Sequence, residues 1–272
     1  MEALVRIVRR IIGGAPIVMA ISCTGPRVDK EPPKPAVTVA PDVTDRVEDN
    51  TPKQLGLFDI TFYYVVTEDD VVPKAAPAND NTSEVTLAAG TQPELVTLYD
   101  YKSCEPIAEV TPEFASMARL QGTGKLRDGR LVNIASRCDC ETKRCFQVLS
   151  EKIQWGTAGT GKPLQPFRTV AVDPKVVKLG ALLYVPLLEG RTMPGRAPWG
   201  GFVHDGCVVA DDTGGGIDDY QLDLFVGKKA YYQGMKSAHG GSHAWARHVP
   251  VYDGSKICER KGRRVGKKQA SI

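Results

Sequence analysis

Five aspartates and three consecutive glycines lie between two apolar runs in residues 208–225, which read VVADDTGGGIDDYQLDLF. Crowded carboxylates repel one another, so such a cluster is typical of a ligand site, a held proton or a turn. Asp212 ends one strand-like run, and Asp173 ends another, TVAVD. Asp223 lies inside QLDLF, where apolar neighbours draw it partly inward. A turn explains an aspartate at a strand end but not Asp223 in mid-strand, so we expect the three carboxylates to converge on one site.

One glycine-rich segment has the spacing of a phosphate-binding loop. Residues 156–162 read GTAGTGK, which fits G-x-x-x-x-G-K. Pro163 follows, however, where a hydroxyl would meet magnesium, and proline pushes the residue before it out of helical geometry. A helix N-terminus is what makes such a loop bind phosphate. We therefore interpret the segment as a flexible Gly/Thr loop.

The histidines give weaker signals than the aspartates. His239 and His243 are four positions apart, but the two glycines between them disfavour the helix that would form a zinc-binding face. His204 precedes Cys207 by three residues, which could indicate a nucleophile pair. A cysteine engaged in a disulfide has no thiolate to offer, so we do not favour that interpretation. No metal site is expected.

The N-terminal residues predict export. Three arginines among the first ten residues precede an apolar segment at 11–21, which is short for a membrane span but typical of a signal-peptide core. The segment ends in AISC, which resembles a bacterial lipobox and predicts lipidation of Cys23. Residues 1–23 are thus expected to be a lipoprotein-type signal peptide, with an ordinary secretory signal as the alternative. The expected location is the periplasmic face of a bacterial membrane, the outer membrane being favoured.

Cysteine usage agrees with export. Without Cys23, an even number remains, which in an oxidising compartment predicts up to three disulfides with 15 alternative pairings. These cysteines are Cys104, Cys138, Cys140, Cys145, Cys207 and Cys258. The run CDCETKRC could instead be a metal knuckle, but it lacks the paired C-x-x-C spacing of most zinc sites.

Composition sets the domain organisation. Hydrophobic residues at 42% and charged residues at 25% are ordinary for a globular protein, and a net charge of +3 gives no indication of nucleic-acid binding. Residues 24–53 contain six prolines and no aromatic residue, so we expect a disordered linker. Residues 254–272 carry seven Lys or Arg and one Glu and are expected to form a solvated basic tail. We expect residues 73–91 to form a polar loop insertion.

Short β-branched and aromatic runs dominate the rest of the chain and predict a mainly β fold. The expected strands are 58–66, 95–99, 131–135, 145–149, 169–172, 181–187, 201–210, 221–226 and 246–252. Only two helices are expected, one opened by Thr111-Pro112 and closed by Gly122, the other at 228–236. Many short strands with few helices indicate a closed or nearly closed β structure, such as a small barrel.

Three motifs in order resemble a known family: VAVDPKVVKLGALLYVP, GCVVADDTGGGIDD and LDLFVG. They are similar to the 3D domain, named for its three aspartates, which occurs in membrane-bound lytic transglycosylase A and in secreted cell-wall proteins. FYY at 62–64 and RHVPVY near residue 250 resemble the first and last strands of that domain. The resemblance implies a six-stranded double-psi β-barrel over residues 54–253, with loop insertions, the main one at 102–164, and one or two short helices.

The resemblance also implies an activity on peptidoglycan glycan strands. Asp173, Asp212 and Asp223 correspond to the three family aspartates, and Asp212 stands where the transglycosylases carry their catalytic acid. The expected reaction cleaves the bond between N-acetylmuramic acid and N-acetylglucosamine and leaves a 1,6-anhydro ring. Asp212 acts as a single acid and base, while Asp173, Asp223 and partial burial raise its pKa. No metal or organic cofactor is needed, and we expect a monomer held at the membrane by the lipid on Cys23.

Several other residues are candidates for substrate binding. Gly214 and Gly215 let a glycan approach the backbone closely. Tyr63, Tyr64 and Trp199 are candidates to stack on sugar rings, with a place in the core as the alternative for each. The chain reads GGGIDD where the family commonly reads GGAIKG, so an acidic pair replaces a basic residue. This departure keeps a second function open, namely a non-catalytic module that binds peptidoglycan or loosens the wall.

Overall fold

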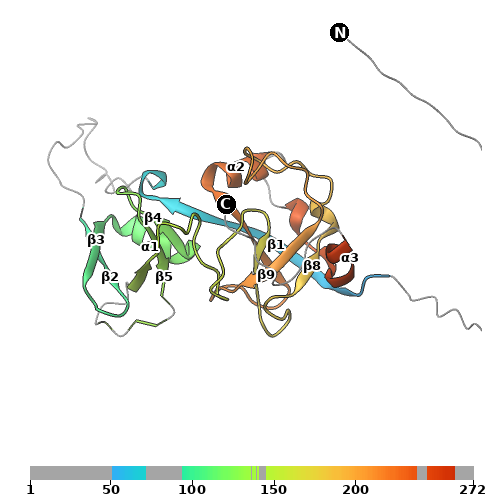
Figure 1. Cartoon of the computed structure of the whole chain (residues 1–272), viewed down its shortest axis with the longest axis horizontal. Helices are drawn as coiled ribbons and strands as arrows, with labels where there is room; N and C mark the ends of the chain where they lie inside the picture. The colour runs from blue at the N-terminus through green and yellow to red at the C-terminus, as the bar shows by residue number, and fades with distance from the viewer. Residues whose placement is uncertain are drawn as a thin grey trace, which may run out of the picture. The chain divides into compact units, whose positions relative to one another are not determined.

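The computed structural model describes residues 51–71, 94–135, 137–138, 140, 145–237 and 244–260 (Figure 1). They belong to one compact unit, Asp49–Ile272. The expected signal peptide with Cys23, nearly all of the expected linker, the polar insertion at 73–91, His239, His243 and residues 261–272 lie outside the described residues. Among the described residues, none of the helices has the length and apolar character that crossing a bilayer requires.

Six strands form a hydrogen-bonded ring. In spatial order they are β10 (Gln221–Lys228), β7 (Thr169–Val172), β9 (Cys207–Asp212), β8 (Leu182–Tyr184), β11 (Val249–Asp253) and β1 (Gln54–Thr67). Parallel pairing of β1 with β10 closes the ring. The pairing of β7 with β9 is also parallel, and the other four are antiparallel. The prediction of a mainly β fold is therefore confirmed, whereas the double-psi topology stays a prediction.

Alternation along the strands separates an inner face of the ring from an outer face. Successive side chains of a strand point to opposite faces. On β10, Leu222, Leu224 and Val226 belong to the main hydrophobic core, so Asp223 and Phe225 point to the other side. On β1, Phe62 and Tyr64 likewise face the main core, while Tyr63 and Val65 join Phe225 in a second cluster. The two faces thus have separate hydrophobic clusters, and the aspartate of β10 lies on the outer one.

A second sheet continues from the C-terminal end of β1, where Val66 pairs with Gly124. Its strands are β4 (Thr123–Lys125), β5 (Leu131–Ile134), β6 (Cys145–Val148), β2 (Val96–Asp100) and β3 (Pro106–Val110), in that spatial order. Figure 1 shows β1, coloured blue to cyan, running from the neighbourhood of β8 to that of β4, where its arrowhead lies. The expected insertion at 102–164 therefore holds most of a sheet, which begins before residue 102 with β2.

Helix α1 (Pro112–Gln121) covers part of this sheet. The residues that predicted its two ends, Thr111 and Gly122, have the expected capping roles. The hydroxyl of Thr111 accepts a hydrogen bond from the Phe114 N–H at 3.2 Å, and Gly122 ends the helix with a φ of 80°. Phe114 is completely buried. The prediction of a helix between Thr111 and Gly122 is confirmed.

The remaining elements correct several expected boundaries. Helix α2 (Lys229–Ser237) agrees with its prediction, but the strand expected at 181–187 ends at β8, because Pro186 opens the short 3-10 helix η2 (Pro186–Leu188). The strand expected at 201–210 begins only at β9. Strands β3 and β4 were not predicted. Two further 3-10 helices are η1 (Glu68–Asp70) and η3 (Ala244–Ala246).

Three disulfides use all six predicted cysteines. They join Cys104 to Cys140, Cys138 to Cys145, and Cys207 to Cys258. The sulfurs of Cys138, Cys140 and Cys145 lie close together, but each is bonded to another sulfur and has no thiolate to offer a metal. The disulfide prediction is confirmed.

The disulfide between Cys207 and Cys258 connects the first residue of β9 to helix α3 (Ser255–Arg260). Both half-cystines are buried. The expectation of a solvated basic tail from residue 254 onward agrees with the exposed side chains of Ser255, Lys256 and Glu259 but is wrong for the buried Cys258 and for the backbone of residues 255–260. They form a helix because the buried disulfide anchors them to the ring.

Replacing both Cys207 and Cys258 by alanine should lower the free energy of unfolding by about 2–5 kcal/mol, because the unfolded chain gains the freedom of a 51-residue loop. Denaturant unfolding of the oxidised proteins measures the change. The Cys104→Ala, Cys140→Ala double variant is the control for a disulfide outside the ring. An unchanged unfolding midpoint with an unchanged slope would contradict the prediction.

Candidate active site

Four neighbouring strands place the candidate residues in one row across the outer face of the ring. Thr61 of β1 pairs with Asp223 of β10, Asp223 pairs with Ala171 of β7, and Ala171 pairs with Asp212 of β9. Neighbouring strands lie about 4.8 Å apart, so the two aspartates are separated by about 10 Å at their Cα atoms. The small side chain of Ala171 between them leaves room for both carboxylates. Asp212 and Asp223 therefore face each other across Ala171.

Asp223 is partly buried, and its carboxyl group has one polar partner that favours ionisation. The Thr61 hydroxyl donates a hydrogen bond to Oδ1 at 2.8 Å, and the Gln221 side chain donates to that hydroxyl at 3.1 Å. Burial raises the pKa of Asp223 to about 6; the charge of Asp212 adds to the increase, and the hydrogen bond from Thr61 opposes it. Asp223 thus holds a proton well above the usual pH range of an aspartate.

Asp212 accepts hydrogen bonds on both carboxylate oxygens. The backbone N–H groups of Gly159 and Thr213 donate to Oδ1 at 2.7 and 2.9 Å. The Tyr63 hydroxyl donates to Oδ2 at 2.5 Å. Burial raises the pKa of Tyr63 well above its usual value, and the adjacent charge of Asp212 acts in the same direction, so this hydroxyl remains a donor. Every contact that the structure gives to the Asp212 carboxylate uses it as an acceptor.

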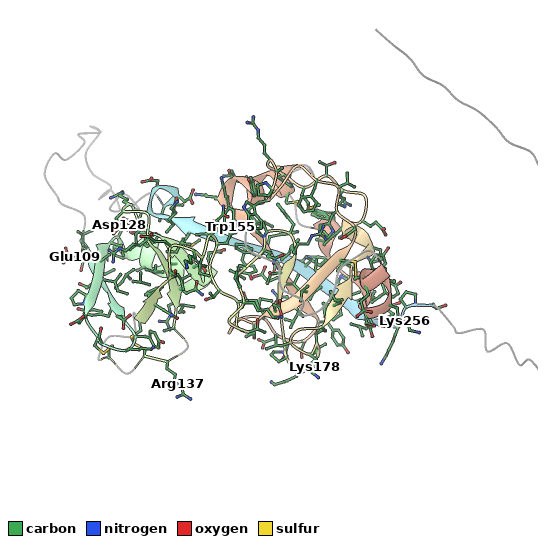
Figure 2. The ribbon with its side chains drawn as sticks, viewed as in Figure 1. Glu109, Asp128, Arg137, Trp155, Lys178 and Lys256 are labelled. Atoms are coloured by element: carbon green, nitrogen blue, oxygen red, sulfur yellow. A yellow bond between two sulfur atoms is a disulfide. The ribbon has the colours of Figure 1, made fainter. Side chains whose placement is uncertain are left out.

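An aromatic cluster lies beneath the two carboxylates. The Tyr63 ring packs on Phe225 with centroids 5.1 Å apart, Phe225 meets Trp155 at 6.2 Å, and Trp155 meets Trp199 at 6.1 Å. Trp155 is labelled in Figure 2, near the middle of the molecule. Partly buried Leu131 of the second sheet also packs on this cluster. The cluster supports the outer face of the ring at the site.

Two of the expected sugar-stacking residues do not have the exposure for that role. Tyr63 is only 7% exposed and uses its hydroxyl to hold Asp212. Tyr64 is 8% exposed, belongs to the main core and packs on Tyr232. For both tyrosines the stacking expectation is wrong, because the ring faces are covered by protein.

Trp199 remains a candidate for stacking. It is only partly buried, and it lines a cavity of about 350 Å³. The other lining residues are Gln165, Pro166, Arg168, Pro198, Phe202, Val203 and Asp205.

Asp173 has the role of a turn residue. Its Oδ1 accepts a hydrogen bond from the Lys175 N–H at 2.9 Å, and its Oδ2 accepts one from the Asp219 N–H at 3.2 Å. The hydrogen bond from Lys175, and to a lesser extent that from Asp219, lowers the pKa of Asp173 despite its burial. Burial and the charge of Asp212, and not Asp173, raise the pKa of Asp223, so the expectation that Asp173 raises the pKa of a catalytic acid is not supported. Its carboxylate instead shapes the chain around the glycine-rich loop.

Asp218 and Asp219, the acidic pair that departs from the family pattern, are explained in part by the backbone conformation at Asp219. Asp219 has a φ of 53°, in the left-handed region that favours glycine and that aspartate tolerates better than most residues. Both Asp218 and Asp219 are exposed. Gly214 and Gly215 are exposed as well, and a Cβ atom built on Gly215 would meet no atom within 4 Å. Their expected role in letting a glycan approach thus stays a prediction.

The sequence interpretation missed a loop that contacts the site. Residues 156–164, named the strap from here on, fold into a short hairpin in which Thr157 bridges Pro163. The Thr160 N–H donates to the Asp211 carbonyl oxygen at 3.1 Å, and the Lys162 ammonium pairs with the Asp211 carboxylate at 2.7 Å. No functional role was predicted for Asp211, and this residue anchors the loop.

Thr61 and Gly159 were missed for different reasons. Thr61 lies two positions before Tyr63 on one strand, so alternation alone places both side chains on the same face and could have found it. Gly159 contributes a backbone N–H, which gives no signal in the sequence. A Cβ atom at this position would lie 2.8 Å from the Thr213 side chain, so any larger residue would have to displace that side chain.

His204 is structural. It is buried, with one ring nitrogen 2.7 Å from the Phe167 carbonyl oxygen, and the other accepts a hydrogen bond from the Gly206 N–H at 2.9 Å. Cys207 is engaged in a disulfide. The decision against a histidine–cysteine nucleophile pair is confirmed.

Comparison with known proteins supports the resemblance inferred from the motifs. Residues 168–239 match the family model of the 3D domain, which covers Asp173, Asp212 and Asp223. No curated protein sequence matches the chain.

Solved structures also match. MltA of E. coli with bound chitohexaose is 14% identical and has a TM-score of 0.42, with 73% of this chain and 71% of that chain covered. The lytic transglycosylase LtgG of Burkholderia pseudomallei is 16% identical, with a TM-score of 0.32 and 71% of each chain covered. A membrane-bound lytic murein transglycosylase from Agrobacterium tumefaciens is 14% identical, with a TM-score of 0.35 and coverage of 77% and 76%.

Titration of the Asp223 carboxyl group, followed by carbon NMR, should give a pKa of about 6. In Thr61→Val the pKa should rise further, because the lost hydrogen bond favoured the charged form. Asp173 serves as an internal reference that titrates below the usual range. A measured pKa of about 3.9 for Asp223, the ordinary value for aspartate, would contradict the prediction.

The same shift should appear in the stability of the protein. The folded state keeps a proton on Asp223 that the unfolded chain releases, so this group contributes stability at low pH that is lost as pH rises to about 6. Unfolding free energies measured across this range in wild type and in Asp223→Asn test the sign. The variant should lack this decline; an equal decline in both proteins would show that another group is responsible.

Proposed function

We propose that the protein is an exported peptidoglycan lytic transglycosylase that cleaves the β-1,4 bond between N-acetylmuramic acid and N-acetylglucosamine. The match of residues 168–239 to the 3D domain supports the substrate class. The observation that carries the reaction type is the pair of unlike carboxyl groups, Asp212 and Asp223, which face each other across Ala171. One of them has a pKa raised to about 6, and the other accepts three hydrogen bonds.

We assign the acid role to Asp223, which differs from the expectation that Asp212 is the acid. A general acid must carry a proton near the working pH, and the raised pKa of Asp223 meets this requirement. Asp212 accepts hydrogen bonds at both oxygens and has no contact in which it donates. Its negative charge instead faces the place where positive charge develops on the sugar ring.

The reaction then needs no water. Asp223 donates its proton to the glycosidic oxygen, the bond from that oxygen to C1 of the muramyl sugar breaks, and an oxocarbenium-like species forms. The ionised Asp223 next takes the proton from the C6 hydroxyl of the same sugar. The C6 oxygen bonds to C1 and closes the 1,6-anhydro ring, and Asp223 is protonated again. This sequence requires no metal or organic cofactor.

The surroundings of the carboxyl pair fit a long polymeric substrate in this proposal. Trp199 lies at the exposed end of the aromatic cluster and is the remaining candidate for stacking on a sugar. Gly214 and Gly215 provide an exposed backbone beside Asp212. A lipid on Cys23 would hold a monomeric enzyme at the periplasmic face of a membrane, the outer membrane being favoured, within reach of the glycan strands.

Digestion of purified sacculi, followed by mass analysis, tests the assignment. Wild type should release anhydro-muropeptides, and Asp223→Asn should lower the rate by at least about 100-fold, because the proton donor is lost. Asp212→Asn should also be slower, while Asp128→Asn controls for the loss of a carboxylate away from the site, since Asp128 is exposed and pairs with Arg130 between β4 and β5 of the second sheet. Full activity in Asp223→Asn together with none in Asp212→Asn would return the acid role to Asp212.

The same experiment distinguishes the proposed enzyme from the second candidate function, a non-catalytic module. Sacculi that stay intact with wild type but retain the protein would favour a non-catalytic peptidoglycan-binding or wall-loosening module. The observation that favours this alternative is the exposed acidic pair Asp218 and Asp219, which stands where the family commonly has a basic residue.

The pH dependence of the rate gives an independent prediction. Because the acid must be protonated, kcat should fall as pH rises through about 6, approaching tenfold per pH unit above that value. Initial rates on soluble glycan fragments measure this. In Thr61→Val the alkaline limb should move to higher pH, in the direction of the pKa. A rate that increases with pH between 5 and 8, a window of about three units around neutrality, would exclude Asp223 as the acid.

A further inference from the structure

Asp212 is held by groups from two distant segments and by its own neighbour. Tyr63 comes from β1, Gly159 from the strap, and Thr213 directly follows Asp212. The donors engage both oxygens, at 2.5 Å on Oδ2 and at 2.7 and 2.9 Å on Oδ1. Because rotation of the carboxylate would lengthen at least one of these bonds, the group has a fixed orientation.

Tyr63 cannot follow Asp212 if the carboxylate turns towards solvent. Its ring is buried and packs on Phe225, so the position of the hydroxyl is set by the aromatic cluster. The raised pKa of Tyr63 keeps the hydroxyl protonated and able to donate. Tyr63 is thus a rigid donor placed before Asp212 is engaged, which reduces the entropy lost on forming the bond.

The strap is tied to the site on both of its sides. Ala158 and Leu164 belong to the same buried cluster as Tyr63. On the other side, the Thr160 N–H and the Lys162 ammonium bind Asp211, next to Asp212. These contacts keep the Gly159 N–H directed at Asp212.

We propose that Tyr63 and Gly159 are positioning residues, which together hold the Asp212 carboxylate over Ala171 and opposite Asp223. The effect on catalysis rests on the proposed function, whereas the positioning itself rests on geometry alone. If either donor is removed, Asp212 turns towards water, where its charge acts more weakly on Asp223 because the dielectric constant is higher. Within the described ranges, the titratable groups next to the pair include Tyr63 on β1, Asp211 on β9 and Lys162 on the strap, and the last two are paired with each other.

The test compares Tyr63→Phe with Tyr184→Phe. Both changes remove a tyrosine hydroxyl that donates to a carboxylate, but the partner of Tyr184 is Glu189, away from the site. In Tyr63→Phe the phenyl ring keeps its packing, and carbon NMR titration should show a lower pKa for Asp223 than in wild type. The kcat should fall on the order of 100-fold with little change in KM, because the reacting groups are misplaced while binding is retained. Tyr184→Phe should change neither quantity.

A second variant keeps the proposal testable if Tyr63→Phe does not fold. Gly159→Ala introduces a Cβ atom 2.8 Å from the Thr213 side chain and should lift the strap from Asp212. The pKa of Asp223 should again fall. An unchanged Asp223 titration in folded Tyr63→Phe or Gly159→Ala protein would overturn the positioning role. The titration needs no substrate, so a wild type that is inactive on sacculi would refute the proposed function and leave this test intact.

Discussion

Parallel pairing between β1 and β10 is the interaction on which the site depends. It closes the ring of six strands and sets Thr61 beside Asp223, although the two residues are 162 positions apart in the chain. Pairing of β10 with β7, and of β7 with β9, then brings Asp212 to the other side of Ala171. A shift of one residue in any of these registers would turn the aspartates to the opposite face. The inner core, which fixes the register through Leu222, Leu224 and Val226, thereby also fixes the separation of the carboxyl groups.

Two chemically identical side chains differ in character because their surroundings differ. Asp223 emerges in mid-strand between buried leucines, with the Thr61 hydroxyl as the partner of its Oδ1, and burial raises its pKa. Asp212 emerges at a strand end, where backbone N–H groups and the Tyr63 hydroxyl are within reach. Position within the strand thus decides which carboxyl group can hold a proton and which is held as an acceptor. The aromatic cluster beneath them supports Tyr63 and the strap together, so packing and electrostatics act through the same residues.

The sequence allowed several of these features to be predicted. Short runs of β-branched and aromatic residues located most strands, the Thr111 cap and Gly122 located α1, and the even number of cysteines indicated the disulfides. The motif around Asp212 and Asp223 indicated a resemblance to the 3D domain, whose family model matches residues 168–239. The different roles of Asp212 and Asp223 could not be predicted from the sequence, because they depend on the strands that close the ring and on the backbone N–H of Gly159. The turn role of Asp173 was considered and set aside, since the sequence does not show that Asp219 donates to it. Tyr63 and Tyr64 were hard to assign because β1 is buried on both faces along its second half, and alternation then gives no exposed side.

The disulfide between Cys207 and Cys258 also links folding to cellular compartment. It closes a loop that contains β9, β10, α2 and β11, including both site aspartates. In a reducing cytosol the two thiols stay apart, so the newly made chain lacks this constraint and its native state is less favoured. Oxidation of the two thiols then favours the fold in which both aspartates are in place, so the redox state of the surroundings decides how readily the site forms.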